Sequence, residues 1–519
     1  MIKTIDIRVA PEDVDNSDVH AAMAKEQLFI ADDVPVVVKV LKRSIDARNR
    51  NVVYQIRVNV YINEIPAEEK KGQPSVKKIA SDQHAVIVGA GPAGLFAALE
   101  LIKLNIKPIV VERGKNVRDR RRDLAAINKA HIVNPESNYC FGEGGAGTFS
   151  DGKLYTRSNK RGDVNQVLET LVQFGASEDI LLDAHPHIGT NKLPVIIQAM
   201  REYIISCGGE VLFDAKLTDI IVENNAVKAV QINNEKIIET GNVILATGHS
   251  ARDIFKLLHQ RGIAIEAKPF ALGVRIEHPQ ILIDQVQYHC DERNDFLPPA
   301  SYSLVHQTSI KPVYSFCMCP GGIIAPCATE QNQVVTNGWS PSKRNNPYAN
   351  SGIVVALEVA DFDNKQYGAL SGMYYQQAIE EKAHLLGGGT QAAPAQRMSD
   401  FIYNKVSSTL PETSYTPGIT SVDLKEVLPP MIAKSLQEGL KEFGKKMKGY
   451  LTNDAVLHAV ESRTSSPVRI PRDKETFEHI QVKGLYPCAE GAGYAGGIMS
   501  AAIDGQKCAE AISKKIQVK

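Results

Sequence analysis

A glycine-rich turn between a short apolar run and an apolar helix constrains this 519-residue chain more than any other feature. Residues 85–88 are continuously apolar, which is typical of a parallel strand buried on both faces. Residues 89–94 follow and match the pattern G-x-G-x-x-G, and residues 93–104 have the apolar content of a buried helix. A strand, such a turn and a helix in this order predict a dinucleotide-binding βαβ unit.

The glycines of this turn have separate physical tasks. Gly89 permits the tight turn, Gly91 lets the backbone approach a pyrophosphate, and Gly94 lets the helix pack closely against the strand. The helix N-terminus presents free N–H groups and its positive dipole end to phosphates. Glu112 ends the second strand (109–111), 18 residues after Gly94. A carboxylate at that position is expected to accept hydrogen bonds from both ribose hydroxyls.

The C-terminal region contains a second glycine-rich segment. An apolar strand at 484–489 is followed by Glu490, by four glycines within 491–497, and by a helix near 499–514. Three of these glycines again fit G-x-G-x-x-G. Only 23 residues follow the third, Gly496, which is too short for a second βαβ unit with an acidic strand end.

The order strand, acid, glycines and helix resembles the second flavin motif of glutathione-reductase-like FAD proteins. In that motif the acid, usually Asp, binds the ribityl chain, and the helix N-terminus faces the pyrimidine side of the isoalloxazine. Residues 243–248 resemble the Ala-Thr-Gly element of the same superfamily. Together with four further motifs the whole chain resembles bacterial FAD-dependent dehydrogenases, also called NAD(FAD)-utilizing oxidoreductases; these motifs are residues 112–114, 143–154, 316–322 and 463–469.

The resemblance implies an α/β fold with a Rossmann-like, glutathione-reductase-type FAD-binding domain. An inserted α+β substrate domain interrupts it, and a small N-terminal α+β domain precedes it. We expect the domain limits to be 1–75, 76–270, 271–460 and 461–519, the second and fourth segments forming the FAD domain. The polar, charged residues 67–75, which include Gly and Pro, have the composition of a linker. Further strands are expected at 210–213, 228–232 and 242–246.

The implied function is that of an FAD-dependent oxidoreductase, a dehydrogenase that transfers a hydride at flavin N5 to or from an unidentified small molecule. A glycine cluster at 142–152 is expected to line the flavin or to form an anion nest. The basic run 118–123 is typical of a solvated helix face, although one of its arginines, or Arg113, is a candidate for the adenosine end. The residues expected to bind FAD are Gly89, Gly91, Pro92, Ala93, Gly94, Glu112, Arg113, Gly145, Gly147, Thr148, Leu217, Thr247, Gly248, Glu490, Gly491, Gly497, Ile498 and Met499.

Polar residues outside the flavin motifs are candidates for the substrate site. Two arginines near the last strand would hold a substrate carboxylate, unless they form an ion pair between domains. Two cysteines separated by one residue would line one face of a strand. We favour simple packing for them over a redox pair, because a disulfide between them closes a strained ring. The candidates are His187, Lys192, Cys317, Cys319, Arg463 and Arg469.

The sequence singles out no catalytic acid or base, and no metal is expected. His185 and His187 lack a third ligand at a suitable spacing. Cys317, Cys319 and Cys327 do not supply the four ligands of an iron–sulfur cluster.

Charge and composition limit the remaining classes. The chain has 59 Lys plus Arg and 59 Asp plus Glu, which argues against nucleic-acid binding because that needs a basic surplus. Eight cysteines are too few for a disulfide framework, and no apolar run approaches the about 18 residues of a membrane span. With no signal peptide evident, we expect a cytoplasmic protein whose partners are a small-molecule substrate and NAD(P)H or another electron donor.

Two alternatives stay open. The first is an NAD(P)-dependent dehydrogenase that uses residues 89–94 for NAD, against which the C-terminal motif argues. The second is a non-catalytic flavin-binding redox sensor, or a scaffold that holds partners through residues 1–75.

Overall fold

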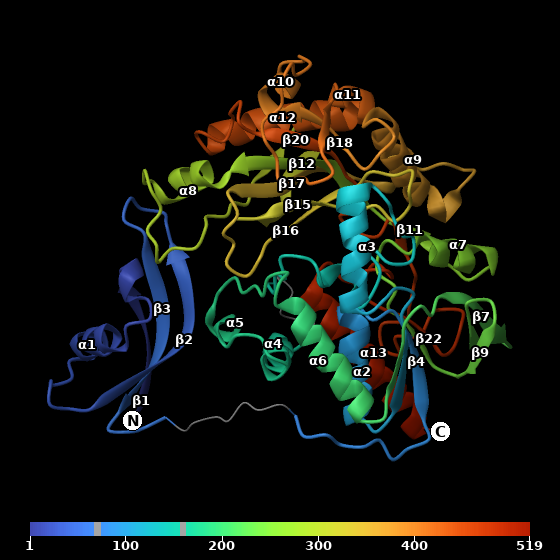
Figure 1. Cartoon of the computed structure of the whole chain (residues 1–519). Coiled ribbons are helices and arrows are strands. Elements are labelled where there is room, and N and C mark those ends of the chain that lie inside the picture. Colours follow the sequence, from blue (N-terminus) through green and yellow to red (C-terminus); the bar gives the residue numbers. More distant parts are fainter. Residues whose placement is uncertain (67–73, 156–161, 519) are drawn as a thin grey trace.

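A computed structural model describes residues 1–66, 74–155 and 162–518 of the chain, so most of the predicted linker at 67–75 lies outside the described residues. Figure 1 shows an N-terminal sheet to one side, a parallel sheet with long helices, and a larger sheet above them. The fold is therefore α/β. The domain limits at 75, 270 and 460 stay predictions.

The N-terminal unit is a three-stranded antiparallel sheet with one helix. Its apolar residues alternate along the strands, so Ile56, Val58 and Val60 are all buried on one face. Helix α1 begins after Asn16, whose side chain accepts a hydrogen bond from the Val19 N–H. The strand order is β1-β3-β2, and the elements are β1 (Ile2–Val9), α1 (Ser17–Leu28), β2 (Val36–Asp46) and β3 (Val53–Ile62).

This unit is packed against the rest of the molecule. Its apolar core is continuous with that of the large sheet. Arg43 donates hydrogen bonds to Asp183 at 2.5 Å and to Asp179 at 3.1 Å, and the Tyr54 hydroxyl donates to the Phe296 carbonyl at 3.1 Å. The unit is therefore held by side-chain contacts in addition to the chain connection.

The parallel sheet contains all the strands on which the nucleotide motifs were placed. The strand order is β22-β10-β4-β5-β6, and every pair is parallel. The apolar run at 85–88 is buried, as expected for a strand covered on both faces. The elements are β4 (His84–Val88), β5 (Lys107–Val111), β6 (Glu210–Leu212), β10 (Val243–Leu245) and β22 (Leu485–Pro487).

The first and last helices of this half lie side by side although about 400 residues separate them (Figure 1). They are α2 (Pro92–Lys103) and α13 (Ile498–Val518). Gly505 allows the close approach, since a Cβ there would overlap the Ala93 backbone. Strand β22 and helix α13 thus complete the unit that β4 and α2 begin.

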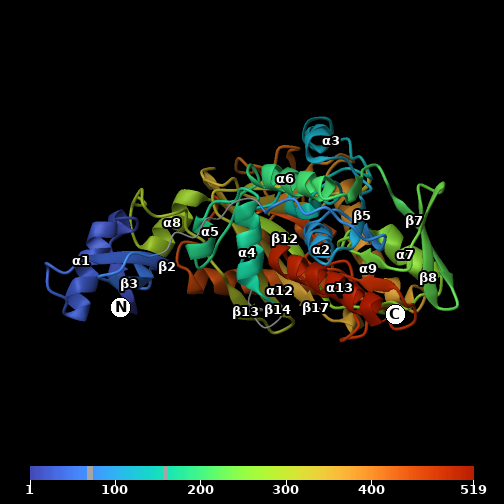
Figure 2. The ribbon, with the colours of Figure 1, turned by 90° about the horizontal axis from the view of Figure 1, so that it is seen from below.

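The segments between β5 and β10 surround this sheet. An antiparallel ribbon of three strands lies at the end of the molecule opposite the N-terminal unit (Figure 2). It consists of β7 (Leu217–Glu223), β8 (Ala226–Ile232) and β9 (Lys236–Glu239). The helices near this sheet are α3 (Val117–Ala130), α4 (Val164–Gln173), α5 (Asp179–Leu182), α6 (Leu193–Ser206) and, after β10, α7 (Arg252–Gln260).

The large sheet has seven strands in the order β13-β14-β17-β12-β20-β18-β19, and only the β18–β19 pair is parallel. Figure 1 shows α10, α11 and α12 on its outer side. Its strands are β12 (Phe270–Pro279), β13 (Val305–Gln307), β14 (Pro312–Cys319), β17 (Tyr348–Leu357), β18 (Ala393–Arg397), β19 (Ile419–Ser421) and β20 (Val456–Glu461). Two small ribbons accompany it, β11 (Glu266–Ala267) with β21 (Val468–Arg469) and β15 (Ile323–Pro326) with β16 (Thr336–Trp339).

The helices of this half are α8 (Gln280–Tyr288), α9 (Ser371–Leu386), α10 (Met398–Ile402), α11 (Leu424–Val427) and α12 (Pro430–Lys446). Among the described residues, no helix is both long enough and apolar enough to cross a lipid bilayer.

Candidate cofactor and substrate site

A cavity of about 430 Å³ opens at the carboxyl ends of β4 and β10. Ligands of open parallel sheets bind at this edge, where loops diverge from neighbouring strands. The cavity is lined by the turn after β4, the loop around residues 145–153, the loop after β10, the start of α13 and the end of β14. It therefore runs from the nucleotide turn to the large sheet.

Two glycine backbones face each other in the cavity wall. A Cβ on Gly91 would meet only Gly145 Cα, at 3.9 Å, and a Cβ on Gly145 would lie 3.2 Å from Gly91 Cα. Gly91 is also the N-cap of α2, and as a glycine it provides no side chain to cap the N–H groups of the first turn. Such a cradle of backbone and helix N-terminus fits a diphosphate.

The other two glycines of the turn serve packing, as predicted. Gly89 has a φ of +105°, and its Cβ would overlap the Ala246 carbonyl oxygen. A Cβ on Gly94 would overlap the Gly89 carbonyl oxygen. Gly94 therefore supports the turn without lining the cavity.

Glu112 lines the cavity, and its carboxylate also accepts hydrogen bonds from three backbone N–H groups, which the sequence did not predict. Its Oε2 accepts the Ala90 N–H at 2.8 Å, and its Oε1 accepts the N–H groups of Gly114 and Gly142 at 3.0 and 2.9 Å. A carboxylate offers about four acceptor positions, so these bonds leave room for about one ribose hydroxyl. The expectation that Glu112 accepts from both hydroxyls is corrected on this ground.

Arg113, a candidate for binding the adenosine end, already forms ion pairs within the protein. Arg113 lines the cavity, but its Nε donates to Glu136 at 2.6 Å and its Nη1 to Asp253 at 2.9 Å. Its guanidinium carbon also lies 4.2 Å from the Phe141 ring centroid. Leu217, at the start of β7, is buried and closes the cavity beside these residues.

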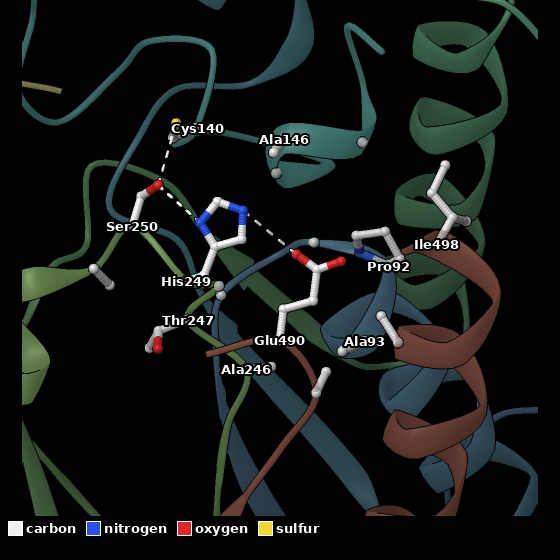
Figure 3. A pocket seen from close by; sticks show the side chains of 18 of the residues that line it. Pro92, Ala93, Cys140, Ala146, Ala246, Thr247, His249, Ser250, Glu490 and Ile498 are labelled. Carbon is white, nitrogen blue, oxygen red and sulfur yellow. Dashed lines mark hydrogen bonds and ion pairs between the residues drawn. The ribbon is translucent and has the colours of Figure 1, made fainter. Parts of the chain in front are cut away.

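A polar chain lies in the middle of the cavity (Figure 3). Glu490 Oε2 lies 3.7 Å from His249 Nε2, and the Ser250 hydroxyl lies 3.2 Å from His249 Nδ1 and 3.5 Å from Cys140 Sγ. Burial, partly opposed by Glu490, lowers the pKa of His249. Thr247 beside it has a buried Oγ1 that finds no hydrogen-bond partner among the described residues.

His249 was missed by the sequence reasoning, although it follows the Ala-Thr-Gly element directly. It lines the cavity together with Glu490 and Thr247. The signal that could have found it is its position two residues after a threonine at the end of a parallel strand.

The start of α13 forms another wall of the cavity. Gly497, Ile498 and Met499 all line it, and Gly497 has a φ of +144°, which favours glycine. Figure 3 shows Ile498 and Pro92 at the ends of two neighbouring helices. Gly145 and Gly147 of the 3₁₀ turn 145–147 face the same space, as the glycine cluster predicted.

Two further predicted residues stand behind the wall. The Thr148 hydroxyl donates to the Glu143 carbonyl at 2.6 Å, and a Cβ on Gly491 would lie 2.7 Å from the Gly248 oxygen.

Arg120 of the basic run is fully buried, and it donates to the Asn138, Tyr139 and Glu143 carbonyls. The expectation of a solvated face is therefore wrong at Arg120, which pins the glycine loop.

The large-sheet end of the cavity is lined by polar side chains. Lys153 Nζ lies 3.8 Å from Cys317 Sγ and 3.7 Å from Cys319 Sγ, and it also donates to the Met318 carbonyl. Asp151 accepts from Arg344 at 2.7 Å. Asp151, Lys153 and Cys317 line the cavity, whereas Cys319 is fully buried behind it.

The cysteines do not lie in a regular strand, which corrects the sequence prediction. The β14–β17 register shifts between Phe316 and Cys319, and Cys317 has a φ of +47°. Both sulfurs nevertheless turn toward Lys153, because the bulge redirects Cys317. The following Gly321 and Gly322 approach the backbones of Arg344 and Trp339.

The two arginines predicted to hold a carboxylate do not act together. Arg463 lines the cavity, but its guanidinium is bound to Glu380, Thr329 and Gln333. Arg469 is exposed and outside the cavity lining. A shared carboxylate clamp is therefore wrong, because Arg463 is already neutralised by Glu380 and Arg469 lies outside the cavity lining.

His187 and Lys192 also lie outside the cavity lining. His187 Nε2 lies 3.1 Å from the Ser342 carbonyl, and its backbone pairs with Lys153. Lys192 is exposed at the N-terminus of α6. The structure therefore does not support their assignment to the substrate.

A second cysteine pair lies under β22. Ligand atoms of Cys488, Asp504 and Cys508 lie within 4.8 Å of one another and are buried. Arg472 already binds both Asp504 oxygens, at 2.6 and 2.8 Å, and Asp504 also accepts the Ala489 N–H. The arginine occupies the charge position that a metal ion would need.

Comparison with known proteins identifies the class. Residues 269–464 match the family described as "FAD-dependent protein, C-terminal domain-like", and residues 1–61 match a domain of unknown function, DUF8436. FAD is therefore the cofactor of this chain.

A full-length relative then defines the family. The chain is 42% identical over 498 residues to an uncharacterized protein of Clostridium beijerinckii, with 92% of each chain covered. The chain belongs to the same family as that protein.

Solved structures show distant likeness. A geranylgeranyl bacteriochlorophyll reductase-like protein from Thermoplasma acidophilum is 14% identical, with 84% of this chain and 79% of that chain covered and a TM-score of 0.36. The L-proline dehydrogenase of P. horikoshii is 14% identical, with 85% and 94% covered and a TM-score of 0.33. Scores at this level carry no argument about the reaction.

Proposed function

We propose that the protein is an FAD-dependent oxidoreductase that acts on a small molecule at the large-sheet end of the cavity. One observation carries the proposal: a single cavity connects the glycine turn, at Gly91, with Lys153 and with Cys317 of the large sheet. FAD, when bound, supplies reversible two-electron transfer. A cofactor that only stabilised the fold would not need a polar extension of its cavity.

The chain's own residues divide the work along this cavity. Gly91 and the first turn of α2 would hold the diphosphate, and Glu112 would accept from one ribose hydroxyl. Glu490 would bind the ribityl chain, with His249 beside it as a further polar contact. The N-terminus of α13 would stabilise negative charge on the reduced ring, because the positive end of its dipole faces the cavity.

The residues at the other end would receive the substrate. Lys153, Asp151 and Asn337 offer donors and acceptors there, beside the aromatic rings of Tyr155 and Phe316. We propose a small-molecule substrate and NAD(P)H, or another electron donor, as partners, with the hydride passing at flavin N5.

The test is a screen with the purified protein under anaerobic conditions. NADH, NADPH and a panel of metabolites are added in separate arms, and bleaching of the oxidised flavin spectrum is followed. At least one compound is expected to bleach the flavin in repeated turnovers once an acceptor is supplied. A flavin that photoreduces normally but responds to no metabolite would favour the redox sensor.

A further inference from the structure

We propose that Cys317 and Cys319 form a dithiol–disulfide pair that exchanges two electrons with FAD in the cavity. The inference deepens the proposed function and rests on it. The sequence favoured simple packing for these cysteines. In the structure, however, two cations lie beside their sulfurs, unlike the surroundings of a buried structural cysteine.

Backbone geometry brings the two sulfurs together. Phe316 pairs with Gly352 and Cys319 pairs with Asn350, so two residues of β14 oppose one residue of β17. Cys317 lies in this bulge with a φ of +47°, a conformation that is uncommon for residues other than glycine. Such bulges re-aim side chains and occur next to active sites. As a result, both sulfurs face the Lys153 ammonium.

Two cations hold this pair. Lys153 Nζ lies within 3.8 Å of both sulfurs, and Arg275 Nη2 lies 3.5 Å from Cys319 Sγ and 2.7 Å from the Cys317 carbonyl oxygen. Arg275 is fully buried and is paired with Glu461 at 3.2 Å. Two cations beside two thiols favour a thiolate, the form that reacts.

The charge divides unequally between the sulfurs. The hydrogen bond with Cys319, together with Lys153 and Arg275, lowers the pKa of Cys317. The same hydrogen bond and burial raise the pKa of Cys319. Deprotonation is therefore favoured at Cys317, at the cavity wall, over Cys319 behind it.

This arrangement suits a balanced two-electron step. The Cys317 thiolate and the Cys319 thiol form an S–S bond, the Cys319 S–H bond breaks, and two electrons and one proton pass to the FAD. The thiols are oxidised and the FAD is reduced, and the reverse step returns the electron pair and proton to the sulfurs. Lys153 and Arg275 stay protonated throughout, so no further oxidant or reductant is needed.

The other buried pair provides an internal control. Cys488 and Cys508 are also adjacent and lie near an arginine, but neither lines the cavity. The hydrogen bond with Cys508, together with burial, raises the pKa of Cys488. These two thiols should not exchange electrons with the cofactor.

The first experiment maps thiols in the wild-type holoprotein. One sample is oxidised with ferricyanide and one is reduced anaerobically with dithionite, and each is then denatured, alkylated with iodoacetamide and digested for mass spectrometry. We expect the peptide with Cys317 and Cys319 to be unlabelled and two hydrogens lighter after oxidation, and doubly labelled after reduction. Cys488 and Cys508 should be labelled in both samples. Labelling of all four cysteines after oxidation, or protection of both pairs, would overturn the inference.

The second experiment counts electrons by anaerobic dithionite titration. Wild type should take up two electron pairs per FAD, whereas Cys317→Ser and Cys319→Ser should each take up one, a two-fold fall. Cys508→Ser is the matched control and should keep two pairs. Uptake of one pair by wild type would contradict the dithiol while leaving the flavoprotein assignment intact. A wild-type protein without bound FAD would instead defeat the proposed function, so the two failures are distinguishable.

Discussion

The two ends of the cavity are built from different material. At the cofactor end, Gly91 and Gly145 present backbone, and the binding surface is made by close approach and a helix N-terminus. At the large-sheet end, Asp151, Lys153 and Cys317 present charged or reactive side chains. Shape therefore governs the first end and charge the second. Substitutions at the first should change cofactor content, and substitutions at the second should change chemistry.

The largest expected effect comes from filling the cradle at the cofactor end. Gly91→Val should abolish FAD binding, because its Cβ would enter the space in front of Gly145, 3.9 Å from Gly145 Cα. The FAD-to-protein ratio after purification measures this. Gly241→Val is the matched control, since a Cβ there meets nothing within 4 Å. Full FAD content in Gly91→Val would mean that the diphosphate does not bind against Gly91.

The next effect concerns the buried ion network behind the large-sheet end. Glu380 is fully buried and pairs with Arg252 at 2.8 Å and with Arg463 at 2.9 Å. Glu380→Gln leaves both guanidiniums without a carboxylate and should lower the free energy of unfolding by about 3–5 kcal/mol. Urea denaturation measures the loss. The control is Glu381→Gln on the same helix, where the partners are amides. Equal stabilities for the two variants would refute the structural role of the network.

Replacing the carboxylate at the ribityl position should have a smaller effect. Glu490→Ala should weaken FAD binding by about 1–3 kcal/mol, the cost of leaving a polar partner unpaired. Glu490→Asp should be milder. Fluorescence titration of apoprotein with FAD gives the dissociation constants. Identical constants for wild type and Glu490→Ala would mean that the C-terminal motif holds another part of the cofactor.

Lys153→Met changes the large-sheet end of the cavity and should alter cysteine reactivity without altering FAD content. The variant keeps the length of the side chain but removes the charge beside Cys317 and Cys319, so alkylation of Cys317 in the folded, reduced protein should slow roughly tenfold, as expected when a thiolate loses its cation. FAD content should stay near that of wild type. If Lys153→Met lost FAD while the alkylation rate of Cys317 stayed unchanged, Lys153 would belong to the cofactor-binding end of the cavity instead.

A further expected effect is a pH dependence of stability. Burial, opposed by Arg275, raises the pKa of the Glu461 carboxyl from 4.5 to about 7. The folded protein therefore favours the protonated form of Glu461. The cost of this preference to the free energy of unfolding is absent below about pH 4.5 and grows until about pH 7. Relative to Glu461→Gln, wild type should lose stability as the pH rises through this window. Urea denaturation of both proteins across the window would contradict the account if the difference stayed flat or changed sign.

The nucleotide-binding half was predictable because its signals are local. The apolar runs at 85–88, 242–246 and 484–489 each lie next to glycines, and the structure contains a strand in each of them. The turn at 89–94 leads from the first of these strands into helix α2. The close approaches at Gly89 and Gly94 follow from the same local geometry. The resemblance to the second flavin motif also identified Glu490, which lines the cavity.

The other end was not predictable, because long-range pairing decides it. Lys153 of the loop after residues 145–147, Cys317 of the bulge in β14 and Asn337 of β16 come from three separate parts of the chain and meet only in the folded structure. Sequence reasoning could not foresee that Glu380 neutralises Arg463 from 83 residues away.

An electron-density map of the protein crystallised with FAD tests the central claim most directly. The account predicts the diphosphate against Gly91 and the first turn of α2. It also predicts the isoalloxazine between Ile498 of α13 and Cys317 of β14. A cofactor bound outside this cavity, or a ring turned away from Cys317, would contradict it.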